Sequence, residues 1–112
     1  MCMKELILDD FKKEVQKSKK PVLLYFSAYW CSSCYLSNDD VNLFEIEHEK
    51  ELKVLKIDVD KQEELALRFE VKNLPCFVLI FKGKQIIRLE GKQTKQQLEE
   101  AFLNKISKNK NK

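Results

Sequence analysis

The chain has 112 residues, of which 44% are hydrophobic and 35% are charged, with two glycines and two prolines. This composition excludes a collagen or a flexible linker and favours one globular domain. Its 21 basic and 18 acidic residues leave a net charge of +3, which is too small to indicate a nucleic-acid partner. The longest apolar runs fall far short of the roughly 18 residues of a membrane span, so we expect no membrane association.

The start of the chain has no apolar stretch of signal-peptide length before acidic residues intervene, and we therefore expect a cytoplasmic protein. Four cysteines in a reducing compartment indicate metal or redox chemistry rather than structural bridges. We expect one domain over residues 1–106 and a frayed basic tail over residues 107–112, which contain only Ser, Lys and Asn. We also expect a monomer.

The first half of the chain is predicted to alternate strands and helices. Residues 4–8 are a possible short strand, after which Asp9 or Asp10 can cap a helix. The unbroken apolar run over residues 22–26 is typical of a central strand buried on both faces. Apolar residues at helical spacing among charged ones predict a long helix over residues 34–49.

The second half is predicted to contain a strand, a helix and a hairpin. Residues 55–60 alternate apolar and polar side chains, as in a strand with one buried face. Residues 62–69 have the spacing of a short helix. The apolar run 76–81, a turn with Gly83, and residues 85–89 predict an antiparallel hairpin.

The last helix is predicted to start at a capping box formed by Thr94 and Gln97, with Leu98, Phe102 and Ile106 following at four-residue spacing. The whole order is then β-α-β-α-β-α-β-β-α. A strand, helix, strand crossover implies a parallel core with helices on both faces, and the hairpin adds an antiparallel edge. The sequence therefore predicts a single α/β domain.

A C-x-x-C motif lies where the central strand gives way to the long helix, in the segment Trp30-Cys31-Ser32-Ser33-Cys34. This junction places Cys31 at a helix N-terminus, where unpaired N–H groups and the helix dipole favour its reactive thiolate. The spacing brings Cys34 to the next turn, as the more buried partner in a small disulfide ring. A C-x-x-C in this position is a much stronger signal than the motif alone.

With these residues, and with residues 6–11, Leu74-Pro75 and Gly91, the chain resembles the thioredoxin family over almost its whole length. The resemblance implies the thioredoxin fold, a central mixed sheet of about five strands flanked by helices on both faces. It also implies a cis Leu74–Pro75 bond beside the cysteine pair, where the backbone of Leu74 can pair with a substrate strand. Without the resemblance, an ordinary turn before a strand is the better reading of this proline.

The resemblance implies a protein-disulfide reductase with no bound cofactor and no metal. Cys31 would attack a disulfide in a client protein, and Cys34 would resolve the mixed disulfide through a reversible dithiol/disulfide couple. An NADPH-dependent thioredoxin reductase would then restore the dithiol. Trp30, Ser32 and Ser33 would shape the substrate-binding surface around the sulfurs, although Trp30 could instead pack in the core.

Two departures from the family pattern lie close to the cysteines. Ser32-Ser33 replaces the usual Gly-Pro, so two hydroxyls could bond to a thiolate or to the backbone. Tyr25 stands where the family commonly has a buried aspartate, while the accompanying lysine is retained as Lys56. We hypothesise that Cys34 loses its proton to water or through the Tyr25 hydroxyl, with slower resolution of the mixed disulfide. The alternative is that Tyr25 only fills core volume.

The remaining cysteines and the single histidine carry weaker signals. Cys76 follows Pro75, where the family usually has Thr; it could act as an additional thiol, but a cysteine in an apolar strand is more often an inert hydrophobe. Cys2 is interpreted as an incidental exposed thiol near the terminus. His48 is expected on the surface, because a single histidine seldom does chemistry without a placed partner.

Three other functions remain open from the residues. Cys31, Cys34 and Cys76, with Cys2, could bind a metal or an iron–sulfur cluster, although one pair and two single cysteines differ from the usual two ligand pairs. A thioredoxin-fold binding module could recognise partners without redox turnover. The same couple could instead act as an oxidant or isomerase in an exported compartment.

Overall fold

The computed structural model describes residues 3–106. The strands are β1 (Lys4–Glu5), β2 (Val22–Ser27), β3 (Lys53–Asp58), β4 (Cys76–Phe81) and β5 (Lys84–Glu90). The α-helices are α1 (Ser32–Glu47), α2 (Glu63–Arg68) and α3 (Lys95–Leu98). Three shorter 3-10 or π-helical segments are η1 (Leu8–Asp10), η2 (Lys12–Gln16) and η3 (Glu99–Leu103), the last of which continues α3.

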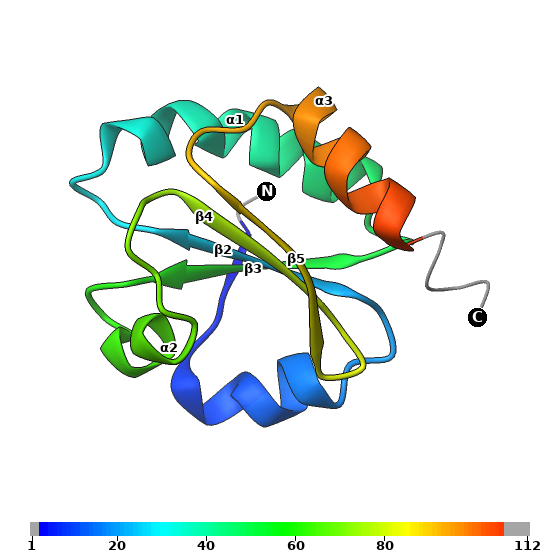
Figure 1. Cartoon of the computed structure of the whole chain (residues 1–112), viewed down its shortest axis with the longest axis horizontal. Helices are drawn as coiled ribbons and strands as arrows, with labels where there is room; N and C mark the ends of the chain where they lie inside the picture. Colours follow the sequence, from blue (N-terminus) through cyan, green and yellow to red (C-terminus); the bar gives the residue numbers. More distant parts are fainter. Residues whose placement is uncertain (1–2, 107–112) are drawn as a thin grey trace.

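The strands form one mixed sheet in the order β1-β3-β2-β4-β5. The first three strands in this order run parallel, and β4 and β5 are each antiparallel to the strand before them. Helices α1 and α3 cover one face of the sheet, and the first helical segments and α2 cover the other (Figure 1). This arrangement confirms the predicted five-stranded sheet between two helical layers.

Strand β2 is buried along its whole length and joins two cores. Leu23 and Tyr25 pack in the cluster that includes side chains of α1 and α3. Val22, Leu24 and Phe26 pack in the opposite cluster, with side chains of η2 and α2. Successive side chains of a strand point to opposite faces, so an uninterrupted apolar run is what a strand between two helical layers requires.

The predicted boundaries of β3 were wrong by two residues, since the strand spans Lys53–Asp58 rather than 55–60. Its end is set by a polar turn in which Oδ1 of Asp58 accepts hydrogen bonds from the main-chain N–H groups of Asp60 and Lys61. Such a local side-chain bond competes with the sheet for the backbone. Alternating hydrophobicity alone does not show at which residue the strand ends.

The predicted N-terminal cap is also wrong. Strand β1 has two residues instead of the expected 4–8, and neither Asp9 nor Asp10 caps the helical segments that follow. The main-chain N–H of Leu8 instead donates to Oε1 of Gln62, at 3.1 Å. The first N–H of η1 is therefore held by a residue from a distant part of the chain.

The predicted basic tail over residues 107–112 and Cys2 lie outside the described residues. Within residues 3–106, no helix combines the length and the apolarity that crossing a lipid bilayer requires.

The predicted capping box at the start of α3 is confirmed. Oγ1 of Thr94 accepts from the main-chain N–H of Gln97 at 3.1 Å, and Oε1 of Gln97 accepts from the N–H of Thr94 at 2.8 Å. Two N–H groups that would otherwise lack a helical partner are satisfied reciprocally. The cap fixes the start of the last helix, whose Leu98 and Phe102 complete the core beneath α1.

We predict that Thr94→Ala lowers the free energy of unfolding by about 1 kcal/mol, because the N–H of Gln97 loses its acceptor. Urea denaturation of the oxidised protein measures the change. Thr94→Ser retains the hydroxyl and should stay close to the original stability. An equal loss in both variants would contradict a role for the cap.

Candidate active site at the start of helix α1

Cys31 caps helix α1 with its sulfur. The residue has an extended backbone, with φ −90° and ψ 106°, and its Sγ accepts a hydrogen bond from the main-chain N–H of Cys34 at 3.1 Å. The helix spans Ser32–Glu47, which confirms the predicted place of Cys31 at its N-terminus and shifts the predicted range 34–49 by two residues. In the dithiol form this N–H and the positive end of the helix dipole would favour a thiolate at Cys31.

Cys31 and Cys34 form a disulfide, with a Cα–Cα distance of 5.3 Å. The side-chain packing is asymmetric, because Cys31 is 7% exposed and Cys34 only 2%. Val59 and Leu74 pack against the pair from the neighbouring loops. Cys31 is thus slightly more accessible than Cys34, although both residues are buried.

The Leu74–Pro75 peptide bond is cis, as the resemblance implies. Leu74 contacts the cysteine pair, and the main-chain oxygen of Pro75 accepts from the N–H of Gly91 at 2.8 Å. Gly91 has φ +91°, a conformation that L side chains rarely adopt. The geometry places the backbone before Pro75 beside the sulfurs.

The loop between α2 and β4 is bound to strand β5 at two points along its length. The guanidinium of Arg88, on β5, donates to the main-chain oxygens of Phe69 and Glu70, which directly follow α2. Farther along, Nδ2 of Asn73 donates to Oε1 of Glu90 at 3.0 Å. Both ends of the segment that faces the disulfide are therefore tied to β5.

Large apolar side chains surround the motif on the surface. Tyr29, Trp30, Tyr35 and Leu36 are 82%, 60%, 75% and 64% exposed, respectively. The indole N–H of Trp30 donates to Oδ2 of Asp60 at 2.8 Å, so this side chain lies outside the core and is held by a polar partner. Exposed apolar groups gathered at one site favour contact with another macromolecule.

The two serines of the motif are also exposed. Within residues 3–106, the hydroxyls of Ser32 and Ser33 make no hydrogen bond. In the disulfide form they are therefore open to solvent, and neither replaces the main-chain N–H that contacts Cys31.

Tyr25 is fully buried behind the motif. Its hydroxyl donates a shared hydrogen bond to the main-chain oxygen of Cys34, at 2.9 Å, and to Oδ1 of Asn38, at 2.8 Å. Its ring stacks on Phe77 with centroids 5.1 Å apart. Burial raises the pKa of this hydroxyl, which keeps its proton in place. Tyr25 thus holds the backbone of the first helical turn and is a poor base for the Cys34 thiol.

A polar recess of about 540 Å³ lies on the Cys34 side of the motif. Cys34, Asn38 and Lys56 are among its lining residues. Lys56 lies opposite Tyr25 in the β2–β3 register, and it makes no ion pair with another residue within 3–106. A polar cavity of this size can admit water, which favours water over Tyr25 as the acceptor of the Cys34 proton.

Cys76 starts β4, is fully buried and forms no disulfide. Burial raises the pKa of its thiol, while the positive charge of Arg88 acts in the opposite direction with a smaller effect. These surroundings favour the inert interpretation. Among residues 3–106, the one group of three donor side chains close enough to share a metal ion contains no cysteine.

The expectation of a surface position for His48 is wrong. Its side chain is only 16% exposed, and Nε2 lies 2.7 Å from Oε2 of Glu99. Glu99 is 51 residues away in the chain, so helical spacing around His48 could not reveal this partner.

Comparison with known proteins identifies the family. The family model described as Thioredoxin matches residues 3–105. Chloroplastic thioredoxin X of Arabidopsis thaliana is 36% identical over 110 residues, which cover 94% of this chain and 60% of the plant protein. Thioredoxin of Buchnera aphidicola is 34% identical over 104 residues, covering 92% of this chain and 94% of that protein. The chain thus spans less than two thirds of the plant relative and nearly all of the bacterial one.

A solved structure shows the same fold. The crystal structure of chloroplastic thioredoxin z superposes with a TM-score of 0.84 over 96% of both chains, at 23% sequence identity. At this low identity, the likeness concerns the arrangement of strands and helices.

We predict that Tyr25→Phe lowers the free energy of unfolding of the oxidised protein by about 1–3 kcal/mol. The buried oxygens of Cys34 and Asn38 lose a donor, while the aromatic ring that stacks on Phe77 is kept. Guanidinium denaturation measures the loss. Tyr29→Phe, at an exposed position, is the matched control and should change stability by less than about 0.5 kcal/mol; similar losses in both variants would refute the role of the buried hydroxyl.

Proposed function

The chain belongs to the thioredoxin family, and we propose that it works as a reductase of disulfide bonds in client proteins. Its Cys31–Cys34 pair is a thiol–disulfide oxidoreductase couple. The observation that carries the proposal is the capping contact, in which the N–H of Cys34 points at Sγ of Cys31. The same contact would stabilise negative charge on Cys31 in the dithiol form.

The reaction follows from the unequal burial of the two sulfurs. The Cys31 thiolate attacks one sulfur of the client disulfide; that bond breaks, a mixed disulfide forms, and the second client sulfur leaves as a thiolate that takes a proton from water. Cys34 then gives its proton to water in the polar recess and attacks Sγ of Cys31. The client leaves as a dithiol, and two electrons have passed to it from the protein, which now holds the Cys31–Cys34 disulfide.

The surface around the sulfurs supports a protein as the substrate. The exposed side chains of Tyr29, Trp30, Tyr35 and Leu36 can cover apolar groups on either side of a client disulfide. The backbone before Pro75 can pair with an extended client segment. Substrate recognition therefore combines nonspecific apolar contact with main-chain hydrogen bonds, which suits several client sequences.

An external two-electron donor must restore the dithiol. We propose an NADPH-dependent thioredoxin reductase, and a cytoplasmic location for the reaction. The relatives include a chloroplastic protein and a bacterial one, so a ferredoxin-dependent reductase is the second candidate. Coupled assays with each purified reductase separate the two, since NADPH consumption that depends on this protein is expected with the first enzyme only.

We predict that the protein accelerates reduction of insulin by dithiothreitol. Cys31→Ser should return the rate to that of dithiothreitol alone, because the attacking sulfur is lost. Cys34→Ser should accumulate a mixed disulfide with the client, which mass spectrometry detects. A rate equal to that of the Cys31→Ser variant would instead favour a binding module without redox turnover.

A second prediction concerns the charge on Cys31. In the reduced protein, alkylation of Cys31 by iodoacetamide should titrate well below the pH of about 8.5 that is ordinary for a free thiol. Peptide mapping after short reaction times assigns the modified residue. A midpoint at the ordinary value would contradict activation by the start of α1.

A further inference from the structure

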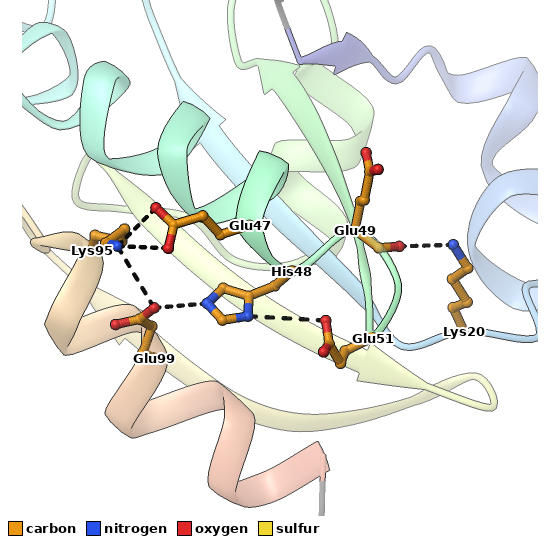
Figure 2. A network of polar contacts seen from close by, with 7 residues as sticks. All are labelled: Lys20, Glu47, His48, Glu49, Glu51, Lys95 and Glu99. Carbon is orange, nitrogen blue, oxygen red and sulfur yellow. Dashed lines mark hydrogen bonds and ion pairs between the residues drawn. The ribbon is translucent and has the colours of Figure 1, made fainter.

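Three potential metal ligands meet where the end of α1 lies beside α3. One ligand atom from each of Glu47, His48 and Glu99 lies within 4.8 Å of the other two. Figure 2 shows that the carboxylates of Glu47 and Glu99 and the imidazole of His48 point toward one another from two different helical segments. The group is far from the sulfurs, because the 16 residues of α1 extend for about 24 Å.

The imidazole of His48 is oriented by its surroundings. Its ring packs against Phe44, with centroids 5.0 Å apart. Nε2 faces Glu99 at 2.7 Å, while Nδ1 lies 3.9 Å from Oε2 of Glu51. That oxygen of Glu51 is buried and has no hydrogen-bond partner. Glu51 therefore places a negative charge near Nδ1 without a hydrogen bond, and the ring position is set by Phe44 and Glu99.

A positive charge already lies between the two carboxylates. Nζ of Lys95 is 2.8 Å from both carboxylate oxygens of Glu47 and 3.9 Å from Oε2 of Glu99. The negative end of the α1 dipole also lies here, since His48 is the C-cap residue. This position therefore favours a cation.

We propose that Glu47, His48 and Glu99 bind a divalent transition-metal ion, with zinc the best match, and that the ion displaces the ammonium of Lys95. One imidazole nitrogen and two carboxylate oxygens are common zinc ligands, and three protein ligands leave one position for water. Magnesium and calcium prefer sets made only of oxygen. The inference is independent of the proposed reductase activity, because it uses none of the cysteines.

Bound zinc would join the end of α1 to the last helix. A ligand that binds only the folded chain raises the free energy of unfolding. Once the ligand concentration exceeds the dissociation constant, this increase grows with the logarithm of the concentration. Lys95 acts as an internal competitor in this arrangement, since its ammonium and the metal use the same carboxylates.

Isothermal titration of the untagged, oxidised protein with zinc chloride tests the site. The disulfide keeps Cys31 and Cys34 from binding the metal, and a Cys2→Ser background removes a further thiol. One zinc ion per chain is expected, with a rise in melting temperature on zinc addition. His48→Ala and Glu99→Gln should each abolish both effects. Absence of zinc binding, or binding that His48→Ala leaves unchanged, would overturn the proposal.

Three further variants separate a built site from general surface charge. Lys95→Met should tighten zinc binding several-fold, because the competing ammonium is gone. Glu51→Gln should weaken it less than His48→Ala does, because it removes only a nearby negative charge, 3.9 Å from Nδ1. Glu49→Gln is the matched control, since it removes the same charge next to His48 while its side chain points away from the group (Figure 2); it should leave affinity unchanged. A loss with Glu49→Gln equal to that with Glu99→Gln would refute the site.

Discussion

The hydrogen bond from the main-chain N–H of Cys34 to the sulfur of Cys31 is the contact on which the active site depends. It requires a helix that begins directly after the first cysteine, and a strand that delivers the chain to that point. Strand β2 meets the second requirement. Its side chains are buried in the cores on both faces of the sheet, and this burial fixes where the strand lies and where it ends. The fold and the chemistry are therefore fixed by the same short segment, in which an apolar strand ends and a polar helix starts.

The interior behind this contact differs from the usual pattern of the family. An aspartate there would introduce an ionisable group beside the second sulfur, whereas Tyr25 is neutral and has its hydrogen bonds satisfied by Cys34 and Asn38. With Tyr25 in place of aspartate, this position lacks a proton acceptor, and its side chain instead holds the first turn of α1 through hydrogen bonds. Water in the polar recess beside Cys34 is then the acceptor of the Cys34 proton, and no buried charged side chain is needed.

Much of the fold was predictable because its strongest signals are local. The apolar runs of β2 and β4, the cysteine spacing and the Thr94–Gln97 cap each involve residues within a few positions of one another. The cis bond before Pro75 was predictable only through the family resemblance. The structure departs from expectation where a distant partner decides, as when Gln62 accepts from the N–H at the start of η1, or Glu99 meets His48. No periodicity encodes such pairings.

The tethering of the loop before Pro75 has a consequence for client recognition. Because Arg88 binds the main chain just after α2 and Gly91 binds the oxygen of Pro75, the segment facing the disulfide is held in place before any client arrives. An incoming chain then loses its own conformational entropy on docking, but the loop loses little. Under the proposed function, such preorganisation would lower the entropic cost of binding an extended client over a small contact area.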